Sequence, residues 1–376
     1  MKCLAPWTNI DIGPNGVIKP CCKFTNDYYD TTYNVLTHSL SDYVLSDLLL
    51  SVKNELEQDR FPKGCERCRI DEESEVQSKR QLDYTRWQEH YDNYDLNDGF
   101  ITASIAFGNT CNLACIMCSP KSSSKWRSEW QEIYNEDIPN VHNAINETFT
   151  QEFLSLSPGL IHIDIPGGEP FISQVDKQKE LLKHYVSSGQ AANITLHYTT
   201  NAQLFPDNEF WELWSNFKEI DMQLSIDGLE TQYEYIRYPG NWNKLLEIAK
   251  KYIALEKTLP NLRLSVSHTV SAYNVYYLDE FFQWCEHIGL PKPYTGRVHN
   301  PPALRPEVLN HPAVIDKLRQ SRYEDVRIWQ QIIVNNTANI LDFIARTQQH
   351  DEYRETNFDD TFPELVNILE EIKNDN

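Results

Sequence analysis

The chain has 376 residues, 40% of them hydrophobic, which is enough for one large domain of roughly 200–250 residues and a smaller one. Its formal net charge of −21 repels polyanions, so the composition argues against bulk nucleic-acid binding. The sequence shows neither a signal-peptide pattern nor an apolar stretch of roughly 18 residues that could span a membrane. We therefore expect a cytoplasmic protein with reduced thiols and no membrane partner.

The first 80 residues are irregular and rich in cysteine. The segment IDIGPNGVI at 10–18 predicts a β-hairpin, because an Asn-Gly turn lies between two apolar runs. Apolar residues at helical spacing favour a helix over 41–56, and residues 71–98 favour a helix that leads into a linker. In a reducing compartment, clustered cysteines more often bind a metal than form disulfides. The cysteines of this region are Cys3, Cys21, Cys22, Cys65 and Cys68.

From about residue 100, short β-prone runs alternate with longer helical patterns. Repeated βα units imply a parallel sheet with right-handed crossovers, and six units predict an α/β fold with a partial (βα)6 TIM-type barrel. Catalytic residues of such barrels lie at the carboxyl ends of the strands. The expected strands are 101–107, 160–165, 194–199, 220–226, 262–270 and 293–299.

Residues 301–376 have apolar residues at helical intervals and predict a helical C-terminal extension. The chain is thus expected to have four consecutive parts. These are a cysteine-rich N-terminal module (1–80), a linker (81–99), the partial barrel (100–300) and the C-terminal extension (301–376).

A loop with three cysteines, CNLACIMC, directly follows the first barrel strand. Its members Cys111, Cys115 and Cys118 have the spacing C-x3-C-x2-C. Three thiolates can hold three irons of a [4Fe-4S] cubane and leave the fourth iron open for an exchangeable ligand. The alternative is a zinc site with a distant fourth ligand, because structural zinc normally has four ligands.

A second motif follows the next strand, where Gly167, Gly168, Glu169 and Pro170 form the sequence GGEP. Two glycines would let a ligand approach the backbone closely, and the carboxylate could bind the ammonium group of that ligand. The alternative is a plain glycine-rich turn.

Together the two motifs resemble those of the radical S-adenosylmethionine (SAM) superfamily. The resemblance implies that Cys111, Cys115 and Cys118 hold a [4Fe-4S] cluster whose open iron binds the amino and carboxylate groups of SAM. It implies that the GGE-type turn contacts the amino group. It also implies reductive cleavage of SAM to a 5′-deoxyadenosyl radical that abstracts a substrate hydrogen, with an electron donor such as flavodoxin or ferredoxin.

Further residues match family elements that contact the cofactor. Asn201 lies in TTN, which resembles a TNG element although Ala202 replaces its glycine. Ser225 and Asp227 lie in LSIDG, which is similar to the SIDG element of peptide-modifying members. Arg237 matches an arginine that pairs with the cofactor carboxylate, and Met117 stands where the family usually has an aromatic residue. For Asn201, Ser225 and Arg237 the alternative is an ordinary polar loop residue.

The N-terminal cysteine pattern resembles the SPASM/Twitch auxiliary-cluster module, which in familiar members follows the barrel rather than precedes it. The resemblance implies that Cys3, Cys21, Cys65 and Cys68 hold an auxiliary [4Fe-4S] cluster. The choice between Cys21 and Cys22 stays open, because neighbouring residues of a hairpin point to opposite faces. A zinc ribbon with four cysteine ligands is the alternative.

The sequence thus predicts a radical SAM oxidoreductase or maturase that acts on a peptide or protein. The same chemistry on a small molecule, such as an amino sugar, nucleoside or alcohol, is the second hypothesis. A non-catalytic iron–sulfur or zinc scaffold, or an electron carrier, is a third hypothesis from another class. No catalytic acid, base or radical-quenching residue can be chosen from the sequence.

Overall fold

The computed structural model describes residues 3–29, 32–73, 77–95, 98–138, 145–334 and 339–375. The chain divides into two compact units, and each unit is assembled from several segments. The first unit comprises Met1–Cys111, Asn140–Tyr198 and Pro206–Ile220, and the second comprises Asn112–Pro139, Thr199–Phe205 and Asp221–Asn376. These units cut across the four consecutive parts expected from the sequence, whose boundaries stay a prediction.

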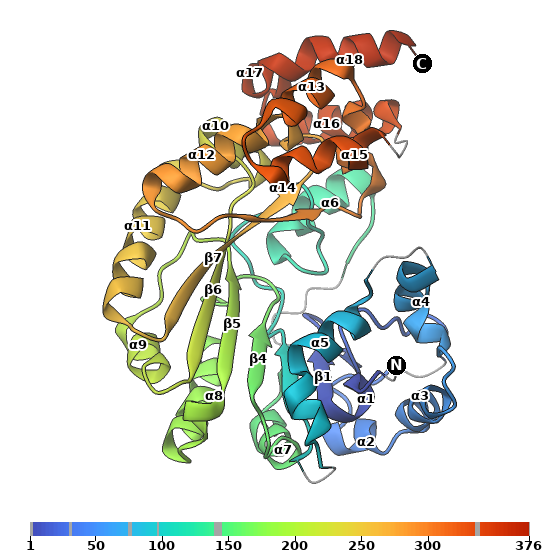
Figure 1. Cartoon of the computed structure of the whole chain (residues 1–376), viewed down its shortest axis with the longest axis vertical. Coiled ribbons are helices and arrows are strands. Elements are labelled where there is room, and N and C mark those ends of the chain that lie inside the picture. Colours follow the sequence, from blue (N-terminus) through green and yellow to red (C-terminus); the bar gives the residue numbers. More distant parts are fainter. Residues whose placement is uncertain are drawn as a thin grey trace. The chain divides into compact units, whose positions relative to one another are not determined.

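An open, mostly parallel sheet with the strand order β2-β1-β3-β4-β5-β6-β7-β8 organises the fold (Figure 1). The α/β class with a partial barrel is therefore confirmed. All six expected barrel strands are present, with ends within two residues of the expected ones. The strands are β1 (Asn9–Ile12), β2 (Ile18–Lys19), β3 (Thr102–Ile105), β4 (His162–Ile165), β5 (Thr195–Thr200), β6 (Glu219–Ser225), β7 (Leu262–Val270) and β8 (Tyr294–Arg297).

The two additional strands come from the predicted N-terminal hairpin, which is confirmed. Strands β1 and β2 pair antiparallel, and Gly16 adopts a φ of +78° in the turn between them. That conformation costs glycine little, because it has no Cβ. Strand β1 also pairs in parallel with β3, so the cysteine-rich segment extends the barrel sheet.

In the first unit, helices cover both faces of the sheet. The buried residues of β5 include Tyr198, whose ring lies 5.2 Å from that of Trp214 in α9 (Asn208–Trp214). On the other face Trp87 of α5 (Lys79–Asp92) packs against His162 of β4, with ring centroids 5.1 Å apart. The other helices of this unit are α1 (Ala5–Thr8), α2 (Leu40–Val44), α3 (Asp47–Glu57), α4 (Glu66–Glu73), α7 (Phe149–Leu156) and α8 (Val175–Ser187).

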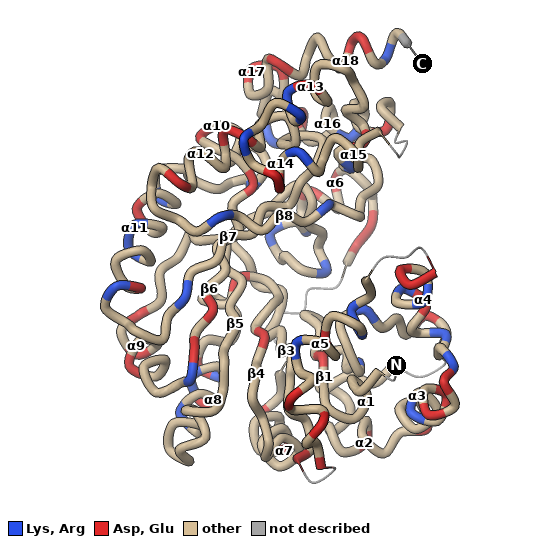
Figure 2. Tube along the Cα trace, in the orientation of Figure 1, with Lys and Arg blue, Asp and Glu red and all other residues tan. Residues whose placement is uncertain are grey.

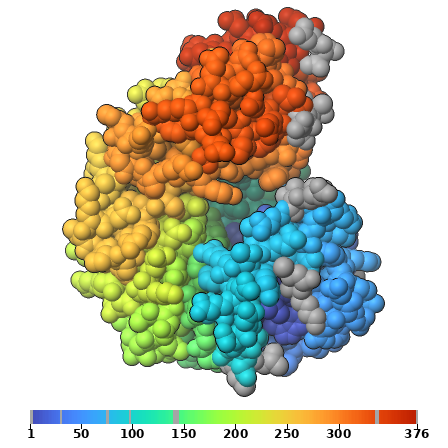
Figure 3. All heavy atoms as spheres, viewed as in Figure 1, coloured from blue at the N-terminus to red at the C-terminus, as the bar shows by residue number. Residues whose placement is uncertain are grey.

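The second unit contains β7 and β8, which pair in parallel, and most of the C-terminal half of the chain. Its C-terminal residues pack around an aromatic core, in which Tyr273 touches Phe343, Phe358 and Phe362 with ring centroids 4.9–6.0 Å apart. Figure 3 shows the outer atoms of this segment in orange and red. The helices are α6 (Arg127–Tyr134), α10 (Glu230–Ile236), α11 (Trp242–Thr258), α12 (Leu278–Ile288), α13 (Pro312–Gln320), α14 (Glu324–Arg327), α15 (Trp329–Val334), α16 (Ile340–Arg354), α17 (Phe358–Thr361) and α18 (Pro363–Asp375).

The helix expected over 41–56 is divided into α2 and α3. The break comes at Ser46, whose side chain accepts a hydrogen bond from the Leu49 N–H and caps a new helix. Because a serine cap competes with continuation of the preceding helix, local polar chemistry overrides the apolar spacing here. Farther along the chain, helix α4 carries both acidic and basic residues, as Figure 2 shows. No helix in the described part of the chain is long and apolar enough to cross a membrane.

Candidate functional site

The GGEP turn of the first unit packs against the segment that leads into the three-cysteine loop. The Gly168 N–H donates to the Gly108 carbonyl (3.1 Å), and the Glu169 N–H donates to the Thr110 carbonyl (2.8 Å). A Cβ on Gly168 would lie 2.2 Å from the Thr110 oxygen, and Gly167 has a φ of +124°. The glycines thus permit a close backbone–backbone approach. Their expected role in admitting a ligand stays a prediction. The turn fixes the residues just before Cys111.

This packing predicts that Gly168→Ala destabilises the protein. The added methyl group would overlap the Thr110 backbone, so we expect the free energy of unfolding to fall by about 1–3 kcal/mol. Denaturant unfolding measures the change. Gly296→Ala is the control, because its added Cβ meets only Tyr294 Cε1 at 3.7 Å, which is an ordinary contact. Equal stability of the two variants would show that the close approach is not needed.

Glu169 is completely buried in this turn. Its Oε1 lies 3.5 Å from the Phe171 nitrogen, and its carbonyl accepts hydrogen bonds from the N–H groups of Ile172 and Ser173. The Ser173 hydroxyl in turn donates to the Thr110 carbonyl (3.0 Å). Burial of a carboxylate costs free energy unless the carboxylate has charged or hydrogen-bonding partners. The backbone bonds around Glu169 hold the residue in this buried position.

In the second unit, the backbone of the cysteine loop is held by other segments. The Cys118 N–H donates to the Cys115 carbonyl at 2.8 Å, which closes a turn inside the loop. The remaining bonds hold backbone groups of the loop, whereas the thiols make contacts of their own, such as that of Cys118 Sγ with the Ser119 carbonyl (3.7 Å). The bonds are Ala114 N–H to Tyr238 O (2.6 Å), Ile116 N–H to Ile236 O (2.8 Å), Ser123 Oγ to Leu113 O (2.5 Å) and Trp126 Nε1 to Cys115 O (2.9 Å).

Two predicted cofactor residues form a buried ion pair beside Cys115. Nη2 of Arg237 lies 2.6 Å from Oδ2 of Asp227, and Nη1 lies 3.8 Å from Cys115 Sγ. Oδ1 of Asp227 accepts a hydrogen bond from the Thr269 N–H (2.6 Å). Burial raises the pKa of the Cys115 thiol, and the Arg237 charge acts against that rise. Burial also opposes the charge on Arg237, but Asp227, together with Cys115 and Tyr233, outweighs the effect of burial, and the pKa of Arg237 rises.

The other predicted cofactor residues are more dispersed. The Asn201 carboxamide donates to Asn112 Oδ1 (2.8 Å) and accepts from the Gln203 N–H (2.9 Å), so it braces the residue that follows Cys111. Ser225 is buried at the end of β6, and Met117 is half-buried in the loop.

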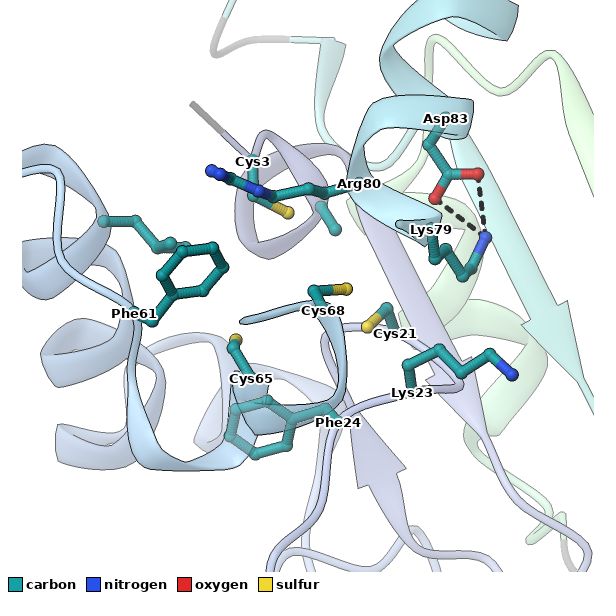
Figure 4. Close-up of a pocket in the computed structure, with 12 residues that line it drawn as sticks. Cys3, Cys21, Lys23, Phe24, Phe61, Cys65, Cys68, Lys79, Arg80 and Asp83 are labelled. Atoms are coloured by element: carbon teal, nitrogen blue, oxygen red, sulfur yellow. Dashed lines mark hydrogen bonds and ion pairs between the residues drawn. The ribbon is translucent and has the colours of Figure 1, made fainter. Parts of the chain in front are cut away.

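The N-terminal cysteines gather around one pocket of the first unit (Figure 4). Cys3, Cys21, Cys65 and Cys68 line it, together with charged residues of α5 and an apolar wall that includes Phe24. Figure 4 shows sulfur atoms of all four cysteines at this pocket. Cys22 is exposed and is not among the lining residues, so the structure places Cys21 rather than Cys22 there.

Burial controls the protonation of these thiols. It raises the pKa of Cys3 to about 11 and that of Cys65 to about 12, and it raises the pKa of Cys21 as well. Metal binding requires thiolates, so a bound group would have to displace protons at neutral pH. Arg80 favours the thiolate form of both Cys3 and Cys65.

Helix α5 supplies positive charge to this pocket from defined positions. Lys79 pairs with Asp83 (2.7 Å), and both residues line the pocket. Arg80 pairs with Glu72 (2.5 Å) and its guanidinium lies 4.4 Å from the centre of the Phe61 ring. Fixed cations of this kind stabilise a negatively charged group held by thiolates.

Across the described residues, no three His, Cys, Asp or Glu side chains lie close enough together to hold a single metal ion. A cubane cluster spreads its cysteine ligands more widely than a single ion does, because each thiolate binds a different iron. The four-cysteine donor set and the cationic wall of the pocket fit such a cluster.

A row of polar residues that sequence reasoning missed crosses the sheet of the first unit. Asp11, Ser104, Asp164 and His197 occupy directly paired positions on β1, β3, β4 and β5. Lys19 of β2 is paired with Asp11 and lies 3.5 Å from its carboxylate. Burial raises the pKa of both Asp11 and Asp164. Only the register of the strands reveals this row, and a single sequence does not fix that register.

No family model matches the chain, and no curated protein matches it. Several solved structures are similar to it at low identity. Native anSMEcpe with bound AdoMet has a TM-score of 0.44 at 15% identity, and the match covers 65% of this chain and 66% of that chain. SuiB from Streptococcus suis has a TM-score of 0.37 at 12% identity, covering 95% and 73%. TYW1 with a lysine-pyruvate adduct bound has a TM-score of 0.33 at 13% identity, covering 63% and 74%. The chain thus spans slightly less than two-thirds of anSMEcpe.

Proposed function

We propose that the chain is a radical SAM enzyme. The observation that carries this proposal is the pair of hydrogen bonds between the GGEP turn and residues 108–110. These bonds join the turn to the residues directly before Cys111, at the carboxyl ends of the paired strands β3 and β4. Chemistry in parallel α/β folds is found at this edge of the sheet.

On this proposal Cys111, Cys115 and Cys118 hold a [4Fe-4S] cluster, and Glu169 binds the amino group of SAM. When bound, the cluster and SAM together supply a 5′-deoxyadenosyl radical for hydrogen abstraction. The protein's own contribution is to orient SAM and exclude water. The residues proposed to surround SAM are Met117, Gly167, Gly168, Pro170, Asn201, Ser225, Asp227 and Arg237.

We also propose that the N-terminal pocket is a SPASM/Twitch-like site for an auxiliary [4Fe-4S] cluster. Its support is the set Cys3, Cys21, Cys65 and Cys68 around one cavity, with Lys79 and Arg80 beside it. Four protein thiolates leave no iron open, so the cluster would relay electrons or hold the fold. A structural zinc ion in this pocket is the competing assignment.

Counting metals tests both assignments at once. The protein is purified without oxygen and reconstituted, and iron, sulfide and zinc are measured per chain. About eight irons and eight sulfides would support two clusters, whereas about four irons and one zinc would make the N-terminal pocket a structural zinc site.

The substrate we propose is a peptide or protein, as the LSIDG element suggests, and the enzyme would be a maturase. A small molecule is the second candidate, since the polar row from Asp11 to His197 could bind hydroxyl or amino groups. The reduced enzyme is incubated with deuterated candidates of each class. Deuterium in 5′-deoxyadenosine identifies the class, and a non-catalytic iron–sulfur carrier would produce no 5′-deoxyadenosine at all.

Glu169→Gln is expected to weaken SAM binding without loss of iron. The amide keeps the shape of the buried carboxylate but loses the charge-assisted hydrogen bond, so the Kd for SAM should rise roughly 10- to 100-fold. Equilibrium dialysis of the reconstituted protein measures it. The control is Glu247→Gln, whose carboxylate pairs with Lys251 on the surface of α11. An unchanged Kd in Glu169→Gln would remove this residue from the site.

A further inference from the structure

A buried side chain of the C-terminal extension, that of Arg354, contacts the cysteine loop. Nη2 of Arg354, the last residue of α16, donates to the Ala114 carbonyl at 2.7 Å. Ala114 directly precedes Cys115, and its N–H is bound by the Tyr238 carbonyl. Both backbone polar groups of this residue are therefore fixed, one of them by a residue 240 positions later in the chain.

Arg354 is itself held in place by a buried network. Its Nε donates to Glu129 Oε1 at 2.9 Å, and Nδ1 of His350 lies 2.6 Å from the same oxygen. The side chains of Arg354, Glu129 and His350 are at most 2% exposed. Burial lowers the pKa of His350, although Glu129 acts against that shift. A neutral His350 leaves Arg354 as the cation that balances Glu129.

Two aromatic rings enclose the guanidinium of Arg354. It lies 5.0 Å from the Trp126 ring centre and 4.9 Å from the Tyr238 ring centre. Trp126 also donates to the Cys115 carbonyl, and Tyr238 accepts from the Ala114 N–H. The residues that enclose Arg354 are thus the same residues that bind the loop on either side of the Ala114–Cys115 bond.

The buried face of α16 differs from that of a helix that only packs against an apolar core. Its buried positions are Ile340, Phe343, Thr347, His350 and Arg354, which recur at helical spacing. The stripe begins apolar and ends with a histidine and an arginine. Replacement of a buried ion pair by apolar residues of similar volume is often neutral or stabilising, so packing alone does not account for this end of the stripe.

We propose that Arg354 is a positioning residue for the cysteine loop, and that α16 is a working part of the cluster site. Held by Glu129 and His350, Arg354 fixes the Ala114 carbonyl and places a positive charge near Cys115. The part that concerns a cluster rests on the function proposed above. The part that concerns the loop backbone does not.

The test compares wild type with Arg354→Met, Arg354→Lys and the control Arg319→Met, in which an exposed arginine of α13 is removed. Hydrogen exchange of residues 112–118 is measured first in the metal-free protein. Iron release to a chelator and the midpoint potential are then measured for the cluster whose EPR spectrum changes on addition of SAM. Exchange in β7 reports whether a variant is folded.

In Arg354→Met we expect faster exchange at 112–118, unchanged exchange in β7, and iron release accelerated roughly 10- to 100-fold. We also expect a more negative midpoint potential, because removal of a nearby positive charge disfavours the reduced cluster. Arg354→Lys keeps the charge but not the forked hydrogen bonds, so it should restore the potential more than the exchange protection. Arg319→Met should behave as wild type.

If residues 112–118 exchange hydrogen at the wild-type rate in both Arg354 variants, the proposal is wrong. If Arg354→Met fails to fold, the comparison of Arg354→Lys with Arg319→Met decides the question in the same way. If wild type binds no cluster in the loop, the proposed function fails, yet the exchange experiment still tests whether Arg354 positions the loop.

Discussion

Replacement of Cys118 by alanine is expected to abolish formation of 5′-deoxyadenosine while the N-terminal pocket keeps its cluster. Loss of one of three thiolates leaves two ligands, which cannot hold the three irons that need protein ligands. The loop backbone should survive, because its hydrogen bonds at Ala114, Cys115 and Ile116 do not involve the Cys118 side chain. The iron content should fall by about four per chain. Chromatographic detection of 5′-deoxyadenosine, with iron analysis of the same sample, measures both effects.

The matched control for this experiment is Cys285→Ala. Cys285 is completely buried in α12, and burial raises the pKa of its thiol. A small buried hydrophobe is its expected role, so the variant should keep both its iron and its SAM cleavage. Undiminished SAM cleavage by Cys118→Ala would contradict the assignment of the cluster to this loop.

The second large effect is expected from two neighbouring cysteines. Cys21→Ala should lose the auxiliary cluster, about four irons per chain, whereas Cys22→Ala should lose none. The reason is geometric, because Cys21 lines the pocket with Cys3, Cys65 and Cys68 while Cys22 is exposed outside it. Iron and sulfide analysis after reconstitution distinguishes the variants.

Each of these two variants serves as the control for the other, since they differ by one position in the same turn. SAM cleavage should persist in Cys22→Ala. Loss of the cluster in Cys22→Ala, with retention in Cys21→Ala, would contradict the ligand set. Equal retention in both variants would contradict a four-cysteine site in this pocket.

The parts of the fold that local sequence determines were predicted well. Strand β5 alternates buried and half-buried residues along its whole length, and such a period-2 pattern is visible in sequence. The hairpin of β1 and β2 could also be predicted locally, because its Gly-Pro-Asn-Gly turn lies between two apolar runs. The split at Ser46 was missed, although a serine followed by aspartate is a recognisable start of a helix.

The parts that depend on distant contacts could not be predicted. The sequence did not reveal that Gly168 packs against the Thr110 backbone, because Thr110 follows a different strand. Arg354 and Glu129 meet across more than half of the chain, so no local pattern reveals their pairing. The one available indication was that His350 and Arg354 continue the buried stripe of α16 with polar side chains.

The most direct test of the central claim is the fate of SAM. The wild-type protein is reconstituted without oxygen, reduced, and incubated with SAM, and 5′-deoxyadenosine is quantified against a sample without protein. A radical SAM enzyme yields 5′-deoxyadenosine that depends on the protein and on the reductant. Intact SAM in the presence of a fully assembled cluster would contradict the proposal and leave the chain as an iron–sulfur carrier or scaffold.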